Sequence, residues 1–455
     1  MIEAPLLWAP RAWIDGGWQS GVLLRIGSEG RWAELLCGQA QPPDAVPLPG
    51  PVLPGMVNAH SHAFQRAFAG LAERRAGAHD DFWSWRERMY GVAQRITPEQ
   101  LGAVAAQLYA ELLQGGYTQV CEFHYLQHAP GNARYADALT ISRALADAAR
   151  QAGIGLTLLP VLYERAGFTE PALRANQQRF ASNVAEVVAL RDGARALGVE
   201  AGIAIHSLRA ARPESIAPLA GEAGPIHIHI AEQRSEVDDC VAATGLRPIE
   251  WLARHVTLDA RWLLVHATHA LPQEIDAVAA SGAGVVLCPS TEANLGDGLP
   301  DLPRWLQRGA SLSLGSDSQV ARAWPRELRL LEEGQRLQLR RRNVGAAPER
   351  GIESTAAHLF DRCVSGGAAA AGFTHWGLRV GARADLLVLD TEAPGLIGVP
   401  ASHALDALVF ATDAPALREV WVAGRRVVAQ GQPLRRAAIA AGFADAMAAL
   451  WTGGA

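Results

Sequence analysis

The sequence predicts an α/β protein: a (β/α)8 barrel joined to a small β-sandwich domain that both ends of the chain build together. Three observations predict this fold. Eight apolar runs alternate with long Ala- and Leu-rich segments typical of helices, short strand-like runs gather at both ends of the chain, and histidines and carboxylates follow the apolar runs.

Both ends of the chain carry short strand-like runs separated by glycine and proline, at residues 6–9, 21–26, 32–36, 384–390 and 419–428. The N-terminal set is too small to be stable alone. In the last run, Ala423-Gly424 indicates a hairpin turn. We therefore expect residues 1–54 and 381–435 to form one β-domain, followed by a C-terminal helix over 436–455.

Residues 55–380 are expected to form the catalytic barrel. After the run that leads to His60, seven further strand-like runs lie at residues 118–123, 156–161, 201–205, 226–230, 262–265, 284–288 and 311–315. Continuous apolar runs are typical of parallel strands that are buried on both faces. Helix-like stretches such as 98–113 and 141–152 fill the gaps.

The composition excludes several classes of protein. Of 455 residues, 49% are hydrophobic and 19% are charged, and the net charge of -5 gives no reason to expect nucleic acid or a membrane surface as partner. The N-terminus lacks a basic segment leading into an apolar one, and no run of about 18 apolar residues occurs, so we expect neither export nor membrane insertion. Five scattered cysteines without a Cys-x-x-Cys motif favour reduced thiols in the cytoplasm.

The chain contains 41 arginines and no lysine. The absence of lysine excludes P-loop chemistry, lysine Schiff bases and pyridoxal phosphate enzymes. It also excludes a metal site that is bridged by a modified lysine.

Polar side chains follow most of the predicted barrel strands, namely His60, His62, Glu122, His124, Tyr125, His206, Arg209, His229, Glu232, His266 and Asp317. In a (β/α)8 barrel the C-terminal strand ends share one rim, where active sites lie. His60 and His62 are two residues apart, so on a strand both imidazoles point to the same side. The set therefore predicts a metal site on this rim.

Three imidazoles and a carboxylate, from His60, His62, His229 and Asp317, form a nitrogen-rich ligand set suited to Zn²⁺. Water on such an ion is acidified to a pKa of about 7. His266 could take or orient the water proton, and Glu232 could pass it to a leaving nitrogen.

These residues resemble a known family. His60-Ser61-His62, His229-Ile230-Ala231-Glu232, His266 and Asp317 are similar to the signatures on strands one, five, six and eight of the amidohydrolase superfamily, in its mononuclear branch of deaminases and iminohydrolases. The binuclear branch usually bridges its metals with a carboxylated lysine. A chain without lysine cannot supply that bridge, so one metal ion is expected.

Longer stretches, at residues 82–90, 122–125, 227–233 and 288–298, resemble the formimidoylglutamate deiminase family, and the likeness covers essentially the whole chain. It implies a homodimeric enzyme of histidine degradation that hydrolyses N-formimino-L-glutamate to N-formyl-L-glutamate and ammonia. Glu232, His266 and Asp317 would then be catalytic. Arg86 and Arg209 would pair with the two substrate carboxylates, and Gln65, Tyr125 and His206 would add neutral hydrogen bonds. Gln319 stands where the family commonly has histidine, which leaves a detail of the pocket open.

Alternatives remain at this stage. His227 shares the face of His229 and is its main rival as a ligand, although the three-residue step to Glu232 favours His229. His124 could support the site or contact substrate. His269 is more typical of a structural histidine. The run Arg340-Arg341-Arg342 is typical of a solvated surface. The rival functions are another deaminase of the superfamily, acting on a purine-like ring or a different amidine, and a scaffold without catalytic activity. The sequence does not distinguish N-formimino-L-glutamate from a close analogue such as formiminoaspartate as the substrate.

Overall fold

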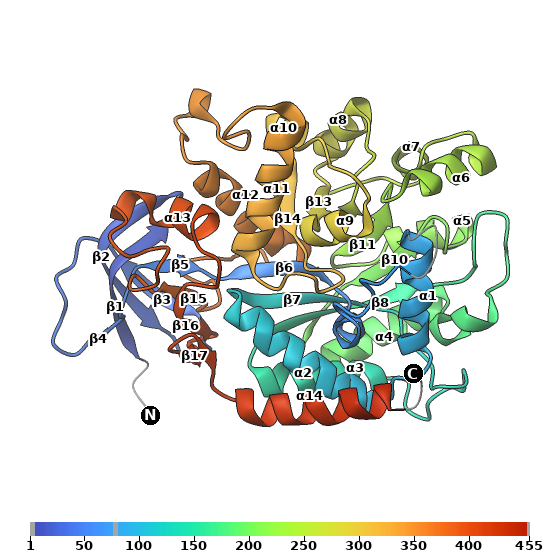
Figure 1. Ribbon diagram of the computed structural model, residues 1–455, viewed down its shortest axis with the longest axis horizontal. Helices are drawn as coiled ribbons and strands as arrows, with labels where there is room; N and C mark the ends of the chain where they lie inside the picture. Colours follow the sequence, from blue (N-terminus) through green and yellow to red (C-terminus); the bar gives the residue numbers. More distant parts are fainter. Residues whose placement is uncertain (1–4, 76–80, 453–455) are drawn as a thin grey trace.

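The computed structural model describes residues 5–75 and 81–452, and its centre is a closed barrel of eight parallel strands (Figure 1). The strands are β6 (Met56–Ser61), β7 (Tyr117–His124), β8 (Gly155–Leu162), β10 (Ile203–Ser207), β11 (Ile226–Ile230), β12 (Trp262–His266), β13 (Gly284–Leu287) and β14 (Ser311–Leu314). The barrel closes because β14 pairs with β6 and β8 pairs with β10. All eight predicted strands are present. The run at 201–205 is divided between the two-residue β9 (Glu200–Ala201) and β10.

The barrel strands are apolar because both of their faces are covered. Every residue of β7, β11, β12 and β13 is buried, whichever way its side chain points. One face looks into the barrel and the other packs against the surrounding helices, so a strand has no solvent face on which polar residues would be favourable. This explains the continuous apolar runs in the sequence.

Helices surround the barrel (Figure 1). They are α1 (Phe82–Ala93), α2 (Pro98–Gln114), α3 (Thr140–Ala152), α4 (Val184–Ala196), α5 (Pro213–Ala220), α6 (Arg234–Thr244), α7 (Pro248–His255), α8 (Pro272–Ser281), α9 (Pro289–Leu295), α10 (Leu302–Gln307), α11 (Trp324–Leu339) and α12 (Thr355–Ala370). The helices predicted at 98–113 and 141–152 are α2 and α3. Thr97 caps α2 by accepting a hydrogen bond from the Gln100 amide, and Pro98 takes the first helical position. Within the residues described, no helix combines the length and apolarity that crossing a membrane requires.

The second domain is a nine-stranded sheet to which both ends of the chain contribute. Its strands are β1 (Leu6–Ile14), β2 (Gly17–Ile26), β3 (Trp32–Leu36), β4 (Val46–Pro47), β5 (Val52–Pro54), β15 (Leu386–Leu389), β16 (Leu417–Val422), β17 (Arg425–Ala429) and β18 (Gln432–Pro433). The two ends meet where β5 pairs with β15 in antiparallel register, with Leu386 opposite Pro54. The expectation of one β-domain built from both ends is confirmed.

The strand β15 lies between two hydrophobic cores. Leu386 and Val388 belong to the core of the small domain, whereas Leu387 and Leu389 belong to the large core that includes the barrel. Successive side chains of a strand point to opposite faces, so four apolar residues in a row serve both cores. The two domains are therefore held together by a continuous strand rather than by surface contacts alone.

The C-terminal part of the chain also follows the sequence pattern. Ala423 and Gly424 join β16 to β17 with φ values of 48° and 74°, the paired left-handed conformations of a tight hairpin turn. After β18, α14 (Arg436–Trp451) runs along α2 on the outside of the barrel (Figure 1). The short α13 (Ala404–Phe410) lies beside α11 and α12. The proposed domain boundaries after residues 54, 380 and 435 remain predictions.

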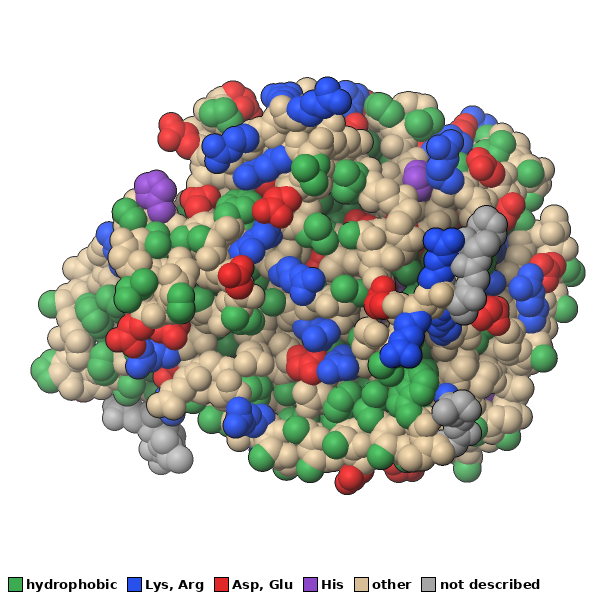
Figure 2. Space-filling view, viewed as in Figure 1, with side chains coloured by type: hydrophobic (Ala, Val, Ile, Leu, Met, Phe, Trp, Pro, Cys, Tyr) green, Lys and Arg blue, Asp and Glu red, His purple; other side chains and the backbone are tan. Residues whose placement is uncertain are grey.

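Basic and acidic side chains are interspersed over the face shown in Figure 2. In one example, Arg66 and Arg322 both place Nε 2.8 Å from Oε2 of Glu111 on α2. Such mixed charge agrees with the small net charge of the chain.

Candidate active site

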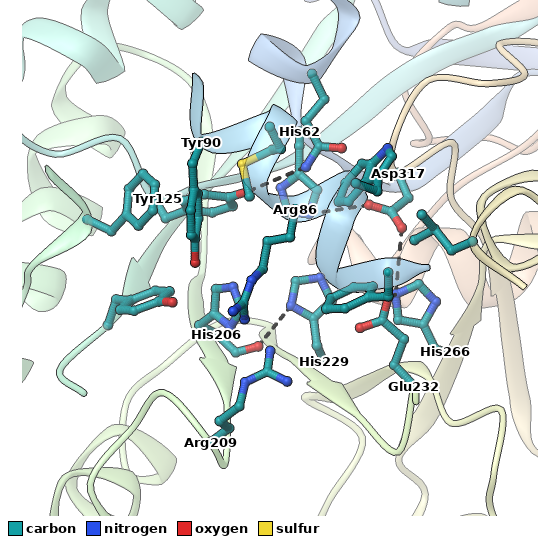
Figure 3. Close-up of a pocket in the computed structure, with 17 residues that line it drawn as sticks. His62, Arg86, Tyr90, Tyr125, His206, Arg209, His229, Glu232, His266 and Asp317 are labelled. Carbon is teal, nitrogen blue, oxygen red and sulfur yellow. Dashed lines mark hydrogen bonds and ion pairs between the residues drawn. The ribbon is translucent and has the colours of Figure 1, made fainter. Parts of the chain in front are cut away.

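A pocket of about 550 Å³ opens at the C-terminal ends of the barrel strands (Figure 3). Most of the residues that the sequence singled out line it together, namely His62, Gln65, Arg86, Tyr125, His206, Arg209, His229, Glu232, His266 and Asp317. His60 lies beneath them and is fully buried. The structure thus brings every predicted site residue to one place.

The backbone at several strand ends is in the left-handed region that non-glycine residues rarely adopt. Ala231, His266 and Asp317 have φ values of 51°, 69° and 43°. Such conformations cost free energy, on the order of 1–3 kcal/mol each, and are found where function needs them. At Gly315, a Cβ atom would lie 2.7 Å from Cβ of His60, so only glycine lets the chain before Asp317 approach that histidine.

Four possible metal ligands converge on one point. The Nε2 atom of His60 lies 3.1 Å from Nε2 of His62 and 3.0 Å from Nε2 of His229. Oδ1 of Asp317 lies 3.4 Å from Nε2 of His60 and 3.3 Å from Nε2 of His62. Ligands about 2.0–2.1 Å from a tetrahedral zinc ion are separated by about 3.3 Å. The spacing of the four atoms fits one ion.

Two of the rings are oriented by backbone carbonyl groups. Nδ1 of His62 donates a hydrogen bond to the oxygen of Phe123, and Nδ1 of His229 donates one to the oxygen of His206, each at 2.8 Å. With the protons on Nδ1, both Nε2 atoms present lone pairs to His60. A single proton on Nε2 of His60 can satisfy only one of them, whereas a cation would satisfy both.

Burial controls the charge of these groups. It lowers the pKa of His60 to about 3, and it lowers the pKa values of His62 and His229 as well. Neutral imidazoles are the form that binds metals. Burial acts to raise the pKa of Asp317, but the hydrogen bond with His60 and the positive charge of His266 act in the opposite direction, and the pKa of Asp317 lies well below its usual range.

His266 and Glu232 form a second group beside the four ligands. Nε2 of His266 lies 3.7 Å from Oε1 of Glu232 and 3.6 Å from Oδ2 of Asp317. Burial would lower the pKa of His266, but Glu232, Glu292 and Asp317 raise it to about 10. Burial raises the pKa of Glu232 to about 7, although His266 acts against this. Glu232 can therefore release or take up a proton near neutral pH, with His266 beside it.

The carboxylate of Glu122, at the end of β7, supports the histidine pair from below. It accepts hydrogen bonds from Oγ of Ser61 at 2.9 Å and from the amide of Ala63 at 2.5 Å. Gln319 donates from Nε2 to Oγ of Ser61 at 3.1 Å and to the carbonyl oxygen of Asp317 at 2.6 Å. Gln319 is fully buried and does not line the pocket, so it supports the ligand residues and does not contact a bound molecule.

Two arginines enter the pocket opposite Glu232 and His266 (Figure 3). Arg86 comes from α1 and Arg209 follows β10, and their guanidinium carbons lie 4.3 Å and 5.5 Å from the ring centre of Trp83. Within the described residues, no carboxylate lies within ion-pair distance of either guanidinium. Burial lowers the pKa of Arg86, and the charge of Arg209 adds to this effect. Two unpaired cations favour an anionic ligand.

Neutral polar groups fill the remaining wall. Gln65 donates a hydrogen bond from Nε2 to the hydroxyl of Tyr125 at 3.3 Å, and its Oε1 is buried without a partner. Tyr163, which the sequence analysis missed, also lines the pocket, and Gln177 donates to its hydroxyl at 3.1 Å. Tyr163 directly follows β8, so its place at the C-terminal end of a barrel strand is the sequence signal for it.

The alternative residues lie elsewhere. Nε2 of His227 is 2.9 Å from the carbonyl oxygen of Ala370, deep in the barrel, and the cluster of possible ligands contains His229 instead. His124 contacts Oγ of Ser142 at 3.3 Å, and neither His124 nor His269 lines the pocket. Residues 340–342 are exposed, as expected for a solvated run.

The fold and the site agree with the comparison to known proteins. The model of the amidohydrolase family matches residues 52–427, so the chain belongs to the amidohydrolase family. It is similar to a formimidoylglutamate deiminase of Pseudomonas aeruginosa, with 46% identity over 433 residues that cover 94% of this chain and 95% of that protein. A 5-methylthioadenosine/S-adenosylhomocysteine deaminase of Desulfovibrio desulfuricans is 29% identical over 84% of this chain and 80% of that protein.

Among solved structures, an amidohydrolase from Brucella melitensis matches with a TM-score of 0.93 and 41% identity, covering 98% of this chain and 99% of that one. An adenosine deaminase from Xanthomonas campestris, solved with bound zinc, has a TM-score of 0.80 at 22% identity, over 99% of both chains. The second match supports the fold alone.

Proposed function

We propose that this protein is a metal-dependent iminohydrolase that converts N-formimino-L-glutamate and water to N-formyl-L-glutamate and ammonia. The observation that carries the proposal is that one pocket holds both a cluster of four possible metal ligands and two arginines that form no ion pair with any carboxylate of the described residues. The substrate offers an amidine at one end and two carboxylates at the other, which matches this arrangement. The similarity to a formimidoylglutamate deiminase over nearly the whole chain supports the same reaction.

His60, His62, His229 and Asp317 would hold one divalent ion, and a set of three imidazoles and a carboxylate favours zinc. An ion bound there supplies Lewis acidity, which makes water a nucleophile near neutral pH. Because the chain has no lysine, it cannot form the carboxylated-lysine bridge between two metals.

The catalytic residues move the protons. Nε2 of His266 and Oδ2 of Asp317 lie 3.6 Å apart, and these two groups manage the proton that leaves the attacking water. The water oxygen forms a bond to the formimino carbon, and this first proton passes to the terminal nitrogen. Glu232 transfers the second proton, from the new hydroxyl group, to the same nitrogen; the carbon–oxygen double bond forms as the carbon–nitrogen bond breaks, and ammonia leaves. The formyl group remains on the glutamate nitrogen.

The substrate-binding residues fix the other end. Arg86 and Arg209 form charge-assisted pairs with the two carboxylates, while Gln65, Tyr125 and His206 offer neutral hydrogen bonds. The stacking of both guanidinium groups near Trp83 limits their rotation before substrate binds.

Two further features belong to this proposal. The five cysteines are unpaired in the structure, which supports a reducing compartment, the cytoplasm. A homodimer follows from the family resemblance, and sedimentation of the purified protein would test it.

The test is ammonia release from N-formimino-L-glutamate by zinc-loaded protein, with the organic product identified by proton NMR. We expect N-formyl-L-glutamate, and no turnover in the Asp317→Ala variant. Zinc-loaded protein that releases no ammonia from this substrate would overturn the assignment.

A further inference from the structure

We propose that Glu292 is a positioning residue for His266: it fixes the imidazole so that Nδ1 carries a proton and Nε2 faces the reacting groups. The kinetic part of this inference rests on the proposed function, but the geometry and the spectroscopic test do not. Glu292 does not line the pocket, and it was part of a sequence motif to which no role was assigned.

The two ring nitrogens of His266 have different surroundings. Nδ1 lies 3.2 Å from Oε1 of Glu292, which is within hydrogen-bond distance. Nε2 is buried without a hydrogen-bond partner, and its nearest carboxylate oxygens are those of Asp317 at 3.6 Å and Glu232 at 3.7 Å. The ring therefore makes its one hydrogen bond on the side away from the pocket and keeps the other nitrogen available.

Glu292 is itself held in place. Its Oε1 also accepts a hydrogen bond from the backbone amide of Cys288 at 2.8 Å, which satisfies a free donor at the start of α9. The side chain is only 2% exposed. A carboxylate only accepts hydrogen bonds, so Oε1 of the Glu292 carboxylate accepts from the Cys288 amide and Nδ1 of His266 is the donor in the second bond. The partner of one ring nitrogen sets the proton position on both.

The backbone of His266 does not fix the ring by itself. The residue ends β12 with φ at 69°, next to Ala267 with φ at 46°, so regular strand geometry has already ended. The ring stacks on His229 at a centroid distance of 5.6 Å, which restrains its plane but does not select between its nitrogens. The contact with Glu292 supplies that selection.

Glu327 offers a matched control. It is also a fully buried carboxylate that holds the first turn of α9, where it accepts hydrogen bonds from the amide of Ser290 at 2.9 Å and from its hydroxyl at 2.6 Å. Replacing it disturbs the same helix without touching His266. Loss of helix anchoring and loss of ring positioning can therefore be separated.

The first test is independent of activity and of any substitution at Glu292. In zinc-loaded protein labelled with ¹⁵N-histidine, long-range proton–nitrogen correlation spectra report which ring nitrogen carries the proton, and the His266→Gln variant assigns the signal. We expect Nδ1 of His266 to be protonated. An unprotonated Nδ1 with a proton on Nε2 would overturn the proposal, whether or not the proposed substrate is turned over.

The second test uses variants. Glu292→Gln keeps an oxygen that can accept both hydrogen bonds, so we expect it to retain kcat within about tenfold, whereas Glu292→Ala should lose about 100-fold in kcat with KM changed less than about threefold and zinc content intact. Glu327→Ala, which removes the anchor of the same helix, should leave the His266 signal and kcat close to the parent values. Equal losses of kcat in Glu292→Ala and Glu327→Ala, with the His266 signal unchanged in both, would show that Glu292 only anchors the helix and would contradict the proposal. If the Glu292→Ala variant does not fold, the spectrum of the parent protein still tests which ring nitrogen of His266 carries the proton.

Discussion

Nε2 of His60 and Nε2 of His229 lie 3.0 Å apart although the two residues are separated by 169 positions in the chain. The contact joins the first and fifth strands of the barrel across its rim. Neither ring could be placed there by local sequence, because the closed sheet alone brings β6 and β11 together. The metal proposal depends on this contact.

The neighbouring histidines on β11 give the sharpest test of the ligand set. His229→Gln should lower zinc affinity at least about 100-fold, because it removes a ligand whose ring is oriented by a backbone carbonyl. His227→Gln should keep its zinc, since that ring faces Ala370. Metal analysis of both purified variants, before and after a chelator, checks this. Full zinc occupancy in His229→Gln would show that the ligand set is wrong.

The two pocket arginines predict how substrate affinity changes when either of them is replaced. Arg209→Gln or Arg86→Gln should raise KM for N-formimino-L-glutamate about 10- to 100-fold, the loss expected when one charge-assisted hydrogen-bond partner worth about 1.5–3 kcal/mol is removed. Lysine should not restore affinity, because it cannot form a bidentate pair. Steady-state kinetics measure the effect, with exposed Arg340→Gln as control. An unchanged KM in both pocket variants would remove the arginines from the binding site.

Glu232 is expected to act in the chemical step alone. Glu232→Gln should lower kcat by about 10²–10⁴-fold, as for loss of a general acid, while zinc content and KM stay near the parent values. Rapid-mixing or steady-state ammonia assays at saturating substrate measure kcat. If the variant kept its kcat but bound substrate poorly, Glu232 would belong with the substrate-binding residues.

Asp361 predicts a pH effect on stability at the contact between the domains. It accepts a hydrogen bond from Nε1 of Trp13 at 2.7 Å, and burial raises its pKa to about 6. A carboxyl with a raised folded-state pKa stabilises the fold below its unfolded pKa near 4, and this contribution is lost as pH rises through 6. Asp361→Asn should therefore be more stable than the parent at pH 8, by about 1–3 kcal/mol, and similar to it at pH 4.

Urea unfolding at the two pH values measures this difference, and the exposed Asp44→Asn variant serves as control. Asparagine can still accept the Trp13 hydrogen bond, so the comparison isolates the charge. Equal stabilities of Asp361→Asn and parent at pH 8 would show that burial of this carboxylate carries no cost.

Much of this architecture follows from the sequence, for reasons visible in single residues. Barrel strands are covered on both faces, so they appear as continuous apolar runs, and the residue after each run marks the rim. His62, His206, His229 and Asp317 were found in this way. Glu292 and Gln319 were not assigned, because their roles depend on contacts with His266 and Ser61 that only the closed barrel creates.

The most direct measurement of the central claim is a comparison of kcat/KM for N-formimino-L-glutamate with the values for N-formimino-L-aspartate, guanine and S-adenosylhomocysteine, all on one zinc-loaded preparation. The two pocket arginines form no ion pair within the described part of the chain, and they predict that kcat/KM for the dicarboxylate amidine exceeds the values for the two purine compounds by at least about 10³-fold, equivalent to about 4 kcal/mol of transition-state stabilisation. The shorter aspartate derivative should fall between them. Faster deamination of a purine compound would contradict the account and make this chain a ring deaminase of the same family.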